Sequence, residues 1–216
     1  MEESNILDGV DFSELDDNFY LEREFDAVKK FRTEGSFSFL RNGHSDGYIG
    51  ISFRNKGKTE PAKYQIDALH YFQKNQNEIL NSFCQFFLDS YPELMESYEQ
   101  FEFDADIGFP ELTNPEQVKS LIGIEGLCIR NQEKNGLAYF GISCSCPWDI
   151  EHGLGVLMHQ ESVILMDRAD ICSFGGRTEI QKDNGTYSEE ELEKSRAEYI
   201  SRLSEEDSRK WWQFWK

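Results

Sequence analysis

The chain has 216 residues, of which 38% are hydrophobic and 14% aromatic, so it can bury a substantial core and is not globally disordered. Its length fits one domain with an appendage, or at most two small domains. The 41 acidic and 22 basic residues give a formal net charge of −19. This charge excludes general binding to phosphate backbones, which requires clustered lysine and arginine, and it fits a basic partner, a bound cation or simple solubility.

The N-terminal sequence is acidic and lacks the basic and apolar regions of a secretory signal. No apolar run approaches the length of a membrane span. We therefore predict a cytoplasmic protein whose cysteines are reduced and pack as small hydrophobes. The five cysteines are Cys84, Cys128, Cys144, Cys146 and Cys172.

The first predicted elements follow an acidic N-terminal segment. Residues 1–28 hold ten acids and one base, a net charge of −9, with apolar residues among them that could dock on a core. The runs 36–39 and 48–53 then alternate with period two around a segment rich in Gly, Asn and Asp, which predicts a β-hairpin.

A long amphipathic helix is predicted over residues 62–90, where apolar residues recur at spacings of three and four. Pro61 suits the first turn of this helix. Pro92 predicts that the helix ends near Tyr91, since proline removes a backbone donor and disfavours helix at the preceding residue. We expect the helix to lie across a sheet and to supply much of the core.

The second half of the chain predicts a short helix and a meander. The motif Asn114-Pro115-Glu116-Gln117 has the residues of a capping box and predicts a helix towards Leu121. Strands are predicted at 122–130, 137–146, 154–158 and 163–165. Helical and hairpin blocks in separate runs favour an α+β fold: an antiparallel sheet, formed by the N-terminal hairpin and the C-terminal meander, packed against one long helix.

Residues 1–176 are therefore predicted to form a single α+β domain with an acidic N-terminal segment. Residues 177–216 are predicted to form a charged helical tail that opens with a capping box at Ser188. The tail ends Trp211-Trp212-Gln213-Phe214-Trp215-Lys216. These aromatic residues could anchor on a membrane surface or a partner, but packing on the protein itself or on a second copy, as in a homodimer, is favoured because exposed aromatics are costly.

The densest polar cluster runs from Cys146 to Gly155 and joins two predicted strands, with Trp148-Asp149-Ile150-Glu151-His152 at its centre. Asp149, Glu151 and His152 could ligate a metal or supply acid–base chemistry. Alternatively Asp149 caps backbone amides, Trp148 fills the end of the core, and the following glycines allow tight backbone paths. Because no metal-ligand spacing is present, a structural turn is favoured, then a partner-binding loop, and a catalytic or metal site comes last.

The segment from Leu137 to Asp170 resembles a family of uncharacterised bacterial domains that carry a Trp-Asp-x-Glu-His-Gly-Leu-Gly turn followed by a strand hairpin. The turn here runs from Trp148 to Gly155 and the hairpin from Val156 to Met166. Some such domains look like immunity proteins of bacterial toxin systems. The resemblance implies a cytosolic bacterial α+β domain and raises the expectation of a binding role.

The acidity itself is local. Residues 89–116 contain nine acids and no lysine or arginine, so this segment and residues 1–28 each carry −9, and the remaining 160 residues carry only −1. Carboxylates interleaved with aromatic residues suit a surface that meets a basic protein, because charge speeds association and aromatic anchors supply affinity.

We therefore predict a non-enzymatic acidic binding protein, most concretely an immunity protein that occludes a toxin domain, with no metal, no cofactor and no nucleic acid. The alternatives are a metal-dependent hydrolase that uses the turn, and a scaffold domain whose acidity keeps it soluble. The predicted partner-binding residues are Phe101, Phe103, Asp104 and Asp106, and secondarily Trp148, Asp149, Glu151 and His152.

Overall fold

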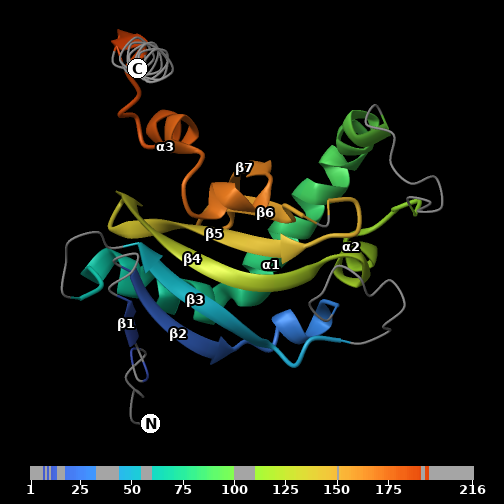
Figure 1. Ribbon diagram of the computed structural model, residues 1–216, viewed down its shortest axis with the longest axis horizontal. Helices are drawn as coiled ribbons and strands as arrows, with labels where there is room; N and C mark the ends of the chain where they lie inside the picture. Colours follow the sequence, from blue (N-terminus) through green and yellow to red (C-terminus); the bar gives the residue numbers. More distant parts are fainter. Residues whose placement is uncertain are drawn as a thin grey trace, which may run out of the picture. The chain divides into compact units, whose positions relative to one another are not determined.

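The computed structural model describes residues 11–13, 18–32, 44–54, 60–99, 110–149 and 151–190, together with Leu7, Gly9, Glu193 and Lys194. Seven strands form one sheet whose spatial order follows the chain (Figure 1). They are β1 (Asp11–Ser13), β2 (Asn18–Glu24), β3 (Tyr48–Arg54), β4 (Gly123–Lys134), β5 (Leu137–Ser145), β6 (Leu154–His159) and β7 (Ser162–Asp167). The predicted α+β class and the predicted meander of β4 to β7 are confirmed.

One pair of neighbouring strands, β3 and β4, is parallel, with Ile51 opposite Leu127. Their connection carries both α1 (Lys63–Glu99) and α2 (Pro115–Leu121), because parallel neighbours need a long crossover. The predicted strand at 48–53 is confirmed, and its antiparallel neighbour is β2. Residues 36–39, the other half of the predicted hairpin, lie outside the described residues.

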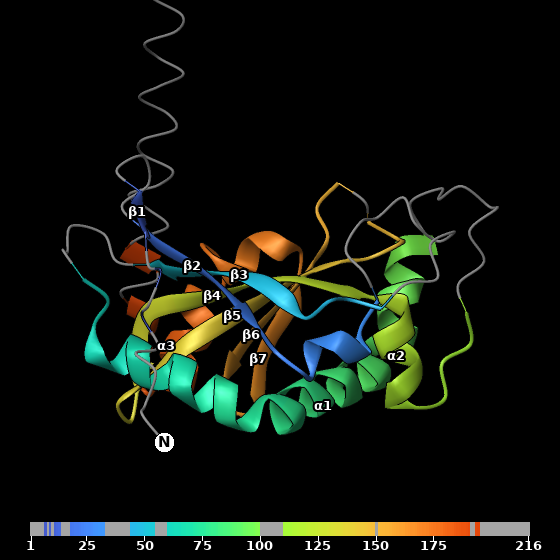
Figure 2. The same cartoon turned by 90° about the horizontal axis from the view of Figure 1, so that it is seen from below.

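Helix α1 lies along one face of the sheet (Figure 2). Its apolar stripe is buried, as the spacing predicts: Leu69, Phe72, Ile79, Phe83 and Phe87 are all at most 1% exposed. Phe72 makes edge-to-face contacts with Phe25 and Phe140, at ring-centroid distances of 5.1 and 5.6 Å. Phe25 follows β2, so the acidic N-terminal segment does dock on the core.

The predicted end of this helix near Tyr91 is wrong, because α1 continues through Pro92 to Glu99. Tyr91 and Met95 are each only 8% exposed. The Tyr91 hydroxyl also donates to the carbonyl oxygen of Pro110 at 3.0 Å. Tertiary packing on both sides of Pro92 therefore outweighs the lost backbone hydrogen bond.

The capping box at the start of α2 is confirmed. The Asn114 side chain accepts from the Gln117 amide at 3.2 Å, and the Gln117 side chain accepts from the Asn114 amide at 3.1 Å. Together the two side chains satisfy donors that the first turn of a helix leaves unpaired.

The sheet face opposite α1 is covered by the segment after β7, which contains η2 (Ala169–Cys172) and the start of α3 (Arg177–Asp183). Arg130 of β4, only 3% exposed, holds this segment by donating to the carbonyl oxygens of Ile171 at 2.8 Å, Cys172 at 3.2 Å and Gly175 at 3.1 Å. Desolvation lowers the pKa of the Arg130 guanidinium, so the carbonyl oxygens compensate for a buried charge.

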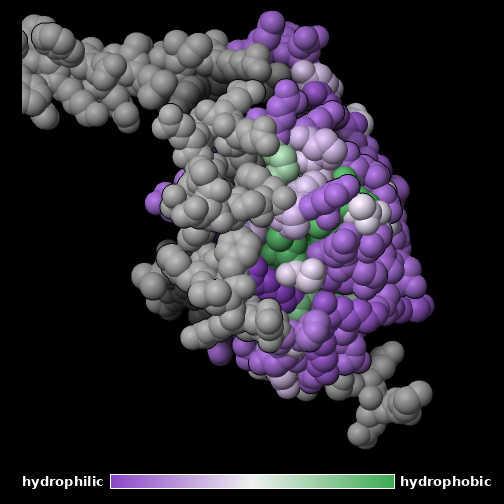
Figure 3. Space-filling model, turned by 90° about the vertical axis from the view of Figure 1, so that its right-hand side faces the viewer, coloured by the Kyte–Doolittle hydropathy of each residue, from purple (hydrophilic) through white to green (hydrophobic). Residues whose placement is uncertain are grey.

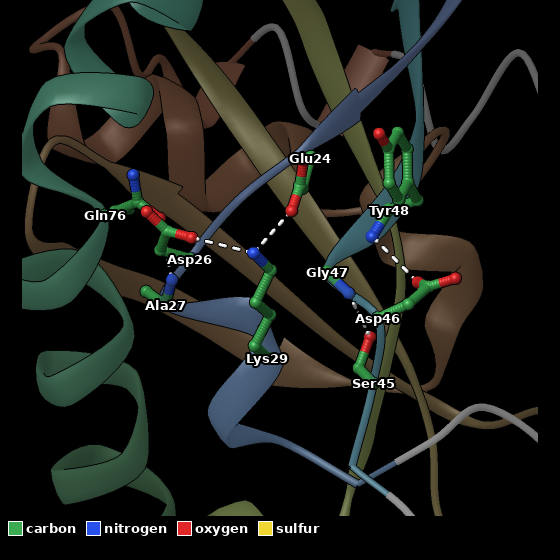
Figure 4. A network of polar contacts seen from close by, with 9 residues as sticks. All are labelled: Glu24, Asp26, Ala27, Lys29, Ser45, Asp46, Gly47, Tyr48 and Gln76. Atoms are coloured by element: carbon green, nitrogen blue, oxygen red, sulfur yellow. Dashed lines mark hydrogen bonds and ion pairs between the residues drawn. The ribbon is translucent and has the colours of Figure 1, made fainter.

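A polar network connects the end of β2 to the start of β3 (Figure 4). Lys29 pairs with Glu24 and, at 2.9 Å, with Asp26, and these carboxylates raise the pKa of its ammonium group. Gly47, at φ +93°, has the left-handed conformation that glycine adopts readily, and a Cβ there would lie 2.8 Å from Lys29 Cγ.

The chain forms two compact units, residues 1–180 and residues 181–216. In the second unit, Glu189 and Glu190 are helical, next to the predicted capping box. The rest of the predicted tail helix beyond Lys194, and the terminal tryptophans, lie outside the described residues. In the described part of the chain, no helix has both the length and the apolar composition needed to span a membrane.

All five cysteines are free and buried, as predicted. Burial raises the pKa of Cys84, Cys146 and Cys172 to about 12 and that of Cys144 well above its usual value. We expect the folded protein to show almost no reaction with Ellman's reagent at about pH 8, because all five thiols are buried and the four with a raised pKa also form little thiolate. All five thiols should react after unfolding in guanidinium, and a fast-reacting thiol in the folded protein would contradict the burial.

Gly141 of β5 is required by packing, since a Cβ at this position would lie 2.4 Å from Cys172 Cα and 2.8 Å from the Cys172 carbonyl oxygen. We expect Gly141→Ala to lower the free energy of unfolding by about 1–3 kcal/mol, because η2 must move off the sheet. Denaturant unfolding would measure the change. An unchanged midpoint would show that η2 is held less tightly than its contacts indicate.

Candidate functional site

The predicted turn between β5 and β6 is organised around the carboxylate of Asp149, which is 7% exposed. Its Oδ1 accepts from the His152 amide at 3.0 Å and lies 2.9 Å from His152 Nδ1. Its Oδ2 lies 3.6 Å from Arg168 Nε. The carboxylate thus caps the turn and also links it to the residue that precedes η2.

The backbone of the turn follows a tight path that needs glycine. The Gly153 amide donates to the Asp149 carbonyl oxygen at 2.9 Å. Gly153 has φ +64°, and a Cβ there would lie 2.6 Å from the Cys144 carbonyl oxygen. Across the turn, the Ala169 amide donates to the His152 carbonyl oxygen at 3.2 Å.

Trp148 fills the end of the core, where it is 1% exposed and its ring lies 5.5 Å from that of Phe87. Its indole Nε1 is buried and has no hydrogen-bond partner among the described residues. Glu151, in contrast, is exposed to solvent. The structure therefore brings Asp149 and His152 together and leaves Trp148 inside and Glu151 outside.

The chemistry open to this turn is restricted. Cys146 donates to the Asp149 carbonyl oxygen at 3.6 Å, but its raised pKa keeps it a neutral thiol rather than a nucleophile. Among the described residues, no group of three His, Cys, Asp or Glu side chains is arranged to hold a metal ion. The contacts of the turn match the structural interpretation, and a partner-binding role for it remains a prediction.

The predicted acidic surface is described only in part, since Phe101, Phe103, Asp104 and Asp106 lie outside the described residues. Five acids of this segment are exposed: Asp89, Glu93 and Glu96 on α1, Glu111 before α2 and Glu116 in α2. Figure 3 views this end of the molecule, where the coloured surface is mainly hydrophilic around a small hydrophobic hollow.

Sequence reasoning missed a second surface, on the sheet face opposite α1. Tyr20 of β2 and Tyr48 of β3 are 38% and 48% exposed, although the hydrophobic residues of β6 are all buried. Glu22 and Glu24 share this side of β2, because Phe19 and Leu21 face the core. The period-two pattern of residues 19–24 is the signal that could have revealed it.

These features define the class of protein: an α+β domain in which one long helix covers a largely antiparallel sheet and a carboxylate-centred turn joins two central strands. The chain belongs to the family described as Domain of unknown function (DUF6985), whose model matches residues 14–174. The expectation of an uncharacterised domain family is thus confirmed. No curated protein and no solved structure matches the chain.

The contacts of Asp149 predict a graded response to alanine substitution. Asp149→Ala should lower the free energy of unfolding by about 1–3 kcal/mol, because the His152 amide loses its acceptor and the turn loses the carboxylate that caps it. His152→Ala should cost less than about 1 kcal/mol, since the side chain is 49% exposed. Chemical unfolding with Glu151→Ala as the exposed control would test this order, and equal effects for all three would contradict it.

Proposed function

We propose that this protein is a non-enzymatic cytoplasmic binding protein that occludes a basic protein partner, as an immunity protein neutralises a toxin. One observation carries the proposal. Phe86, Asp89, Glu93 and Glu96 are exposed on α1 at spacings of three, four and three, so they form one stripe on the helix. We call these four residues the α1 stripe.

The α1 stripe combines the two properties that a surface for a basic protein requires. Three carboxylates in a segment without lysine or arginine create a negative field that speeds the encounter with a basic partner. Phe86, 39% exposed, supplies an aromatic side chain that a partner can desolvate.

Lys119, the first lysine after this stripe along the chain, does not pair with its carboxylates. Lys119 of α2 is only 5% exposed, and its ammonium group contacts Glu116 Oε1 at 2.5 Å and Asn81 Oδ1 at 3.0 Å. The positive charge of Lys119 is therefore paired inside the fold, where α1 and α2 are in contact.

A double charge reversal, Glu93→Lys with Glu96→Lys, tests the proposal. The partner would first be isolated by affinity capture from the native cell and its affinity for the purified chain then measured by calorimetry. We expect the double variant to weaken binding by about 10- to 100-fold at low salt, and wild-type binding to weaken as salt rises. Stability should be unchanged, because both side chains are exposed.

The matched control is Glu78→Lys, an exposed acid on the same helix about four turns before Glu93. It should leave the affinity close to that of wild type. Partner binding that is insensitive to both salt and the double reversal would refute an electrostatic binding role for the α1 stripe.

A further inference from the structure

The sheet face opposite α1 is covered unevenly. Over β5 and β6, Tyr139 and Leu157 are fully buried beneath the segment that contains η2. Over β2 and β3, the side chains of Tyr20 and Tyr48 are exposed. Figure 2 shows η2, in orange, on the side of the sheet opposite α1. We call the uncovered surface of β2 and β3 the open face.

Gly50 lies in the middle of β3 on the open face. A Cβ at this position would meet no atom within 4 Å, and its φ is not among the positive values found at other glycines. Neither packing nor backbone conformation therefore requires glycine here. Glycine in the interior of a strand loses stabilising side-chain packing and often marks a place where a ligand or another chain approaches closely.

Gly50 and Gly126 form the floor of a groove of about 250 Å³ between the open face and the edge of η2. Tyr20, Ser52, Ser143 and Ser173, which carry hydroxyl groups, are among its lining residues, and the Ser143 and Ser173 hydroxyls donate to the Gly126 carbonyl oxygen and to Cys128 Sγ. We call it the Gly50 groove. It is large enough for one long side chain, and its polar atoms are hydroxyl and backbone groups that can accept hydrogen bonds.

Charges of both signs lie beside the groove, and the negative one is next to Gly50. Glu22 lies directly opposite Gly50 in the β2–β3 register, and Glu24 lies opposite Tyr48. Glu24 is paired with Lys29 (Figure 4), whereas no lysine or arginine in the described part of the chain forms an ion pair with the carboxylate of Glu22. Arg54, on the same side of β3, lies 4.1 Å from the Phe174 ring centroid and is held there.

We infer that the Gly50 groove receives an arginine side chain of the basic partner protein, an inference that rests on the proposed function. A guanidinium group fits because it can stack on tyrosine rings, pair with the Glu22 carboxylate and donate to several acceptors at once. Arginine is preferred to lysine, because a planar group with five donors can pair with a carboxylate and stack on an aromatic ring at the same time, which a compact ammonium group does less well.

The substitution Gly50→Val separates binding from folding. Valine favours strands and would meet no neighbouring atom at its Cβ, so the melting temperature should be unchanged or raised. Its side chain should fill the floor of the groove and exclude a ligand. Gly50→Ala, which adds only a methyl group, is the milder matched variant, and Glu22→Gln removes the charge while keeping the shape.

The probe is N-acetyl-arginine amide, titrated into the full-length ¹⁵N-labelled chain and followed by NMR. We expect saturable shifts at the amides of Gly50, Ser52 and Gly126, with the weak affinity typical of a single residue. The neutral isostere N-acetyl-citrulline amide should bind at least about fivefold more weakly. Gly50→Val should abolish the shifts, and Glu22→Gln should raise the dissociation constant by about three- to tenfold.

The inference is overturned if Gly50→Val binds the arginine probe like wild type, or if the shifts are confined to the α1 stripe. Shifts of the Gly50 amide that depend on protein concentration without probe would instead assign the groove to a second copy of the chain and also overturn it. Affinity for the captured partner separates the two proposals. Loss with Glu93→Lys/Glu96→Lys but retention with Gly50→Val would refute the groove alone, whereas retention with all variants would refute both.

Discussion

The turn at His152 and the Gly50 groove both depend on how the segment after β7 is held on the sheet. The Arg130 guanidinium donates hydrogen bonds to three carbonyl oxygens of the segment after β7. Gly141 and Gly155 allow its backbone to approach, since a Cβ on Gly155 would lie 2.6 Å from the Arg168 carbonyl oxygen. This segment covers β5 and β6, supports the turn at His152 through Ala169 and forms one wall of the Gly50 groove. One buried cation thus holds the segment over β5 and β6, together with the apolar contacts of Ile171, Cys172 and Ile180.

The fold places exposed acids of both acidic segments beside exposed aromatic residues. The N-terminal acidic segment contributes β2, whose apolar residues enter the core while Glu22 and Glu24 remain exposed beside tyrosines. The later acidic segment forms the end of α1, where carboxylates again accompany an exposed aromatic residue in Phe86. Two segments far apart in the sequence therefore present the same combination of charge and aromatic surface, which suits a basic partner at either place.

Local signals predicted the helices, the capping box and the meander, because each depends on residues close together in sequence. The end of α1 predicted from Pro92 is wrong, because the buried packing of Tyr91 and Met95 depends on tertiary contacts that the local sequence does not show. The sequence did not predict that β3 pairs with β2 and β4. It also did not predict that only part of the sheet face opposite α1 is covered. Alternation shows that a strand has two different sides, but not whether a segment more than a hundred residues later covers one of them.

The turn from Trp148 to Gly155 has a more distinctive sequence than β3, yet it is the weaker functional candidate. Asp149 caps amides, Trp148 fills the core, and Gly153 and Gly155 avoid backbone clashes, so folding alone accounts for these residues. Gly50 has no comparable explanation, since the fold accommodates a side chain there and gains nothing evident from its absence. A residue whose identity the fold does not require is better evidence for binding than one that folding explains completely.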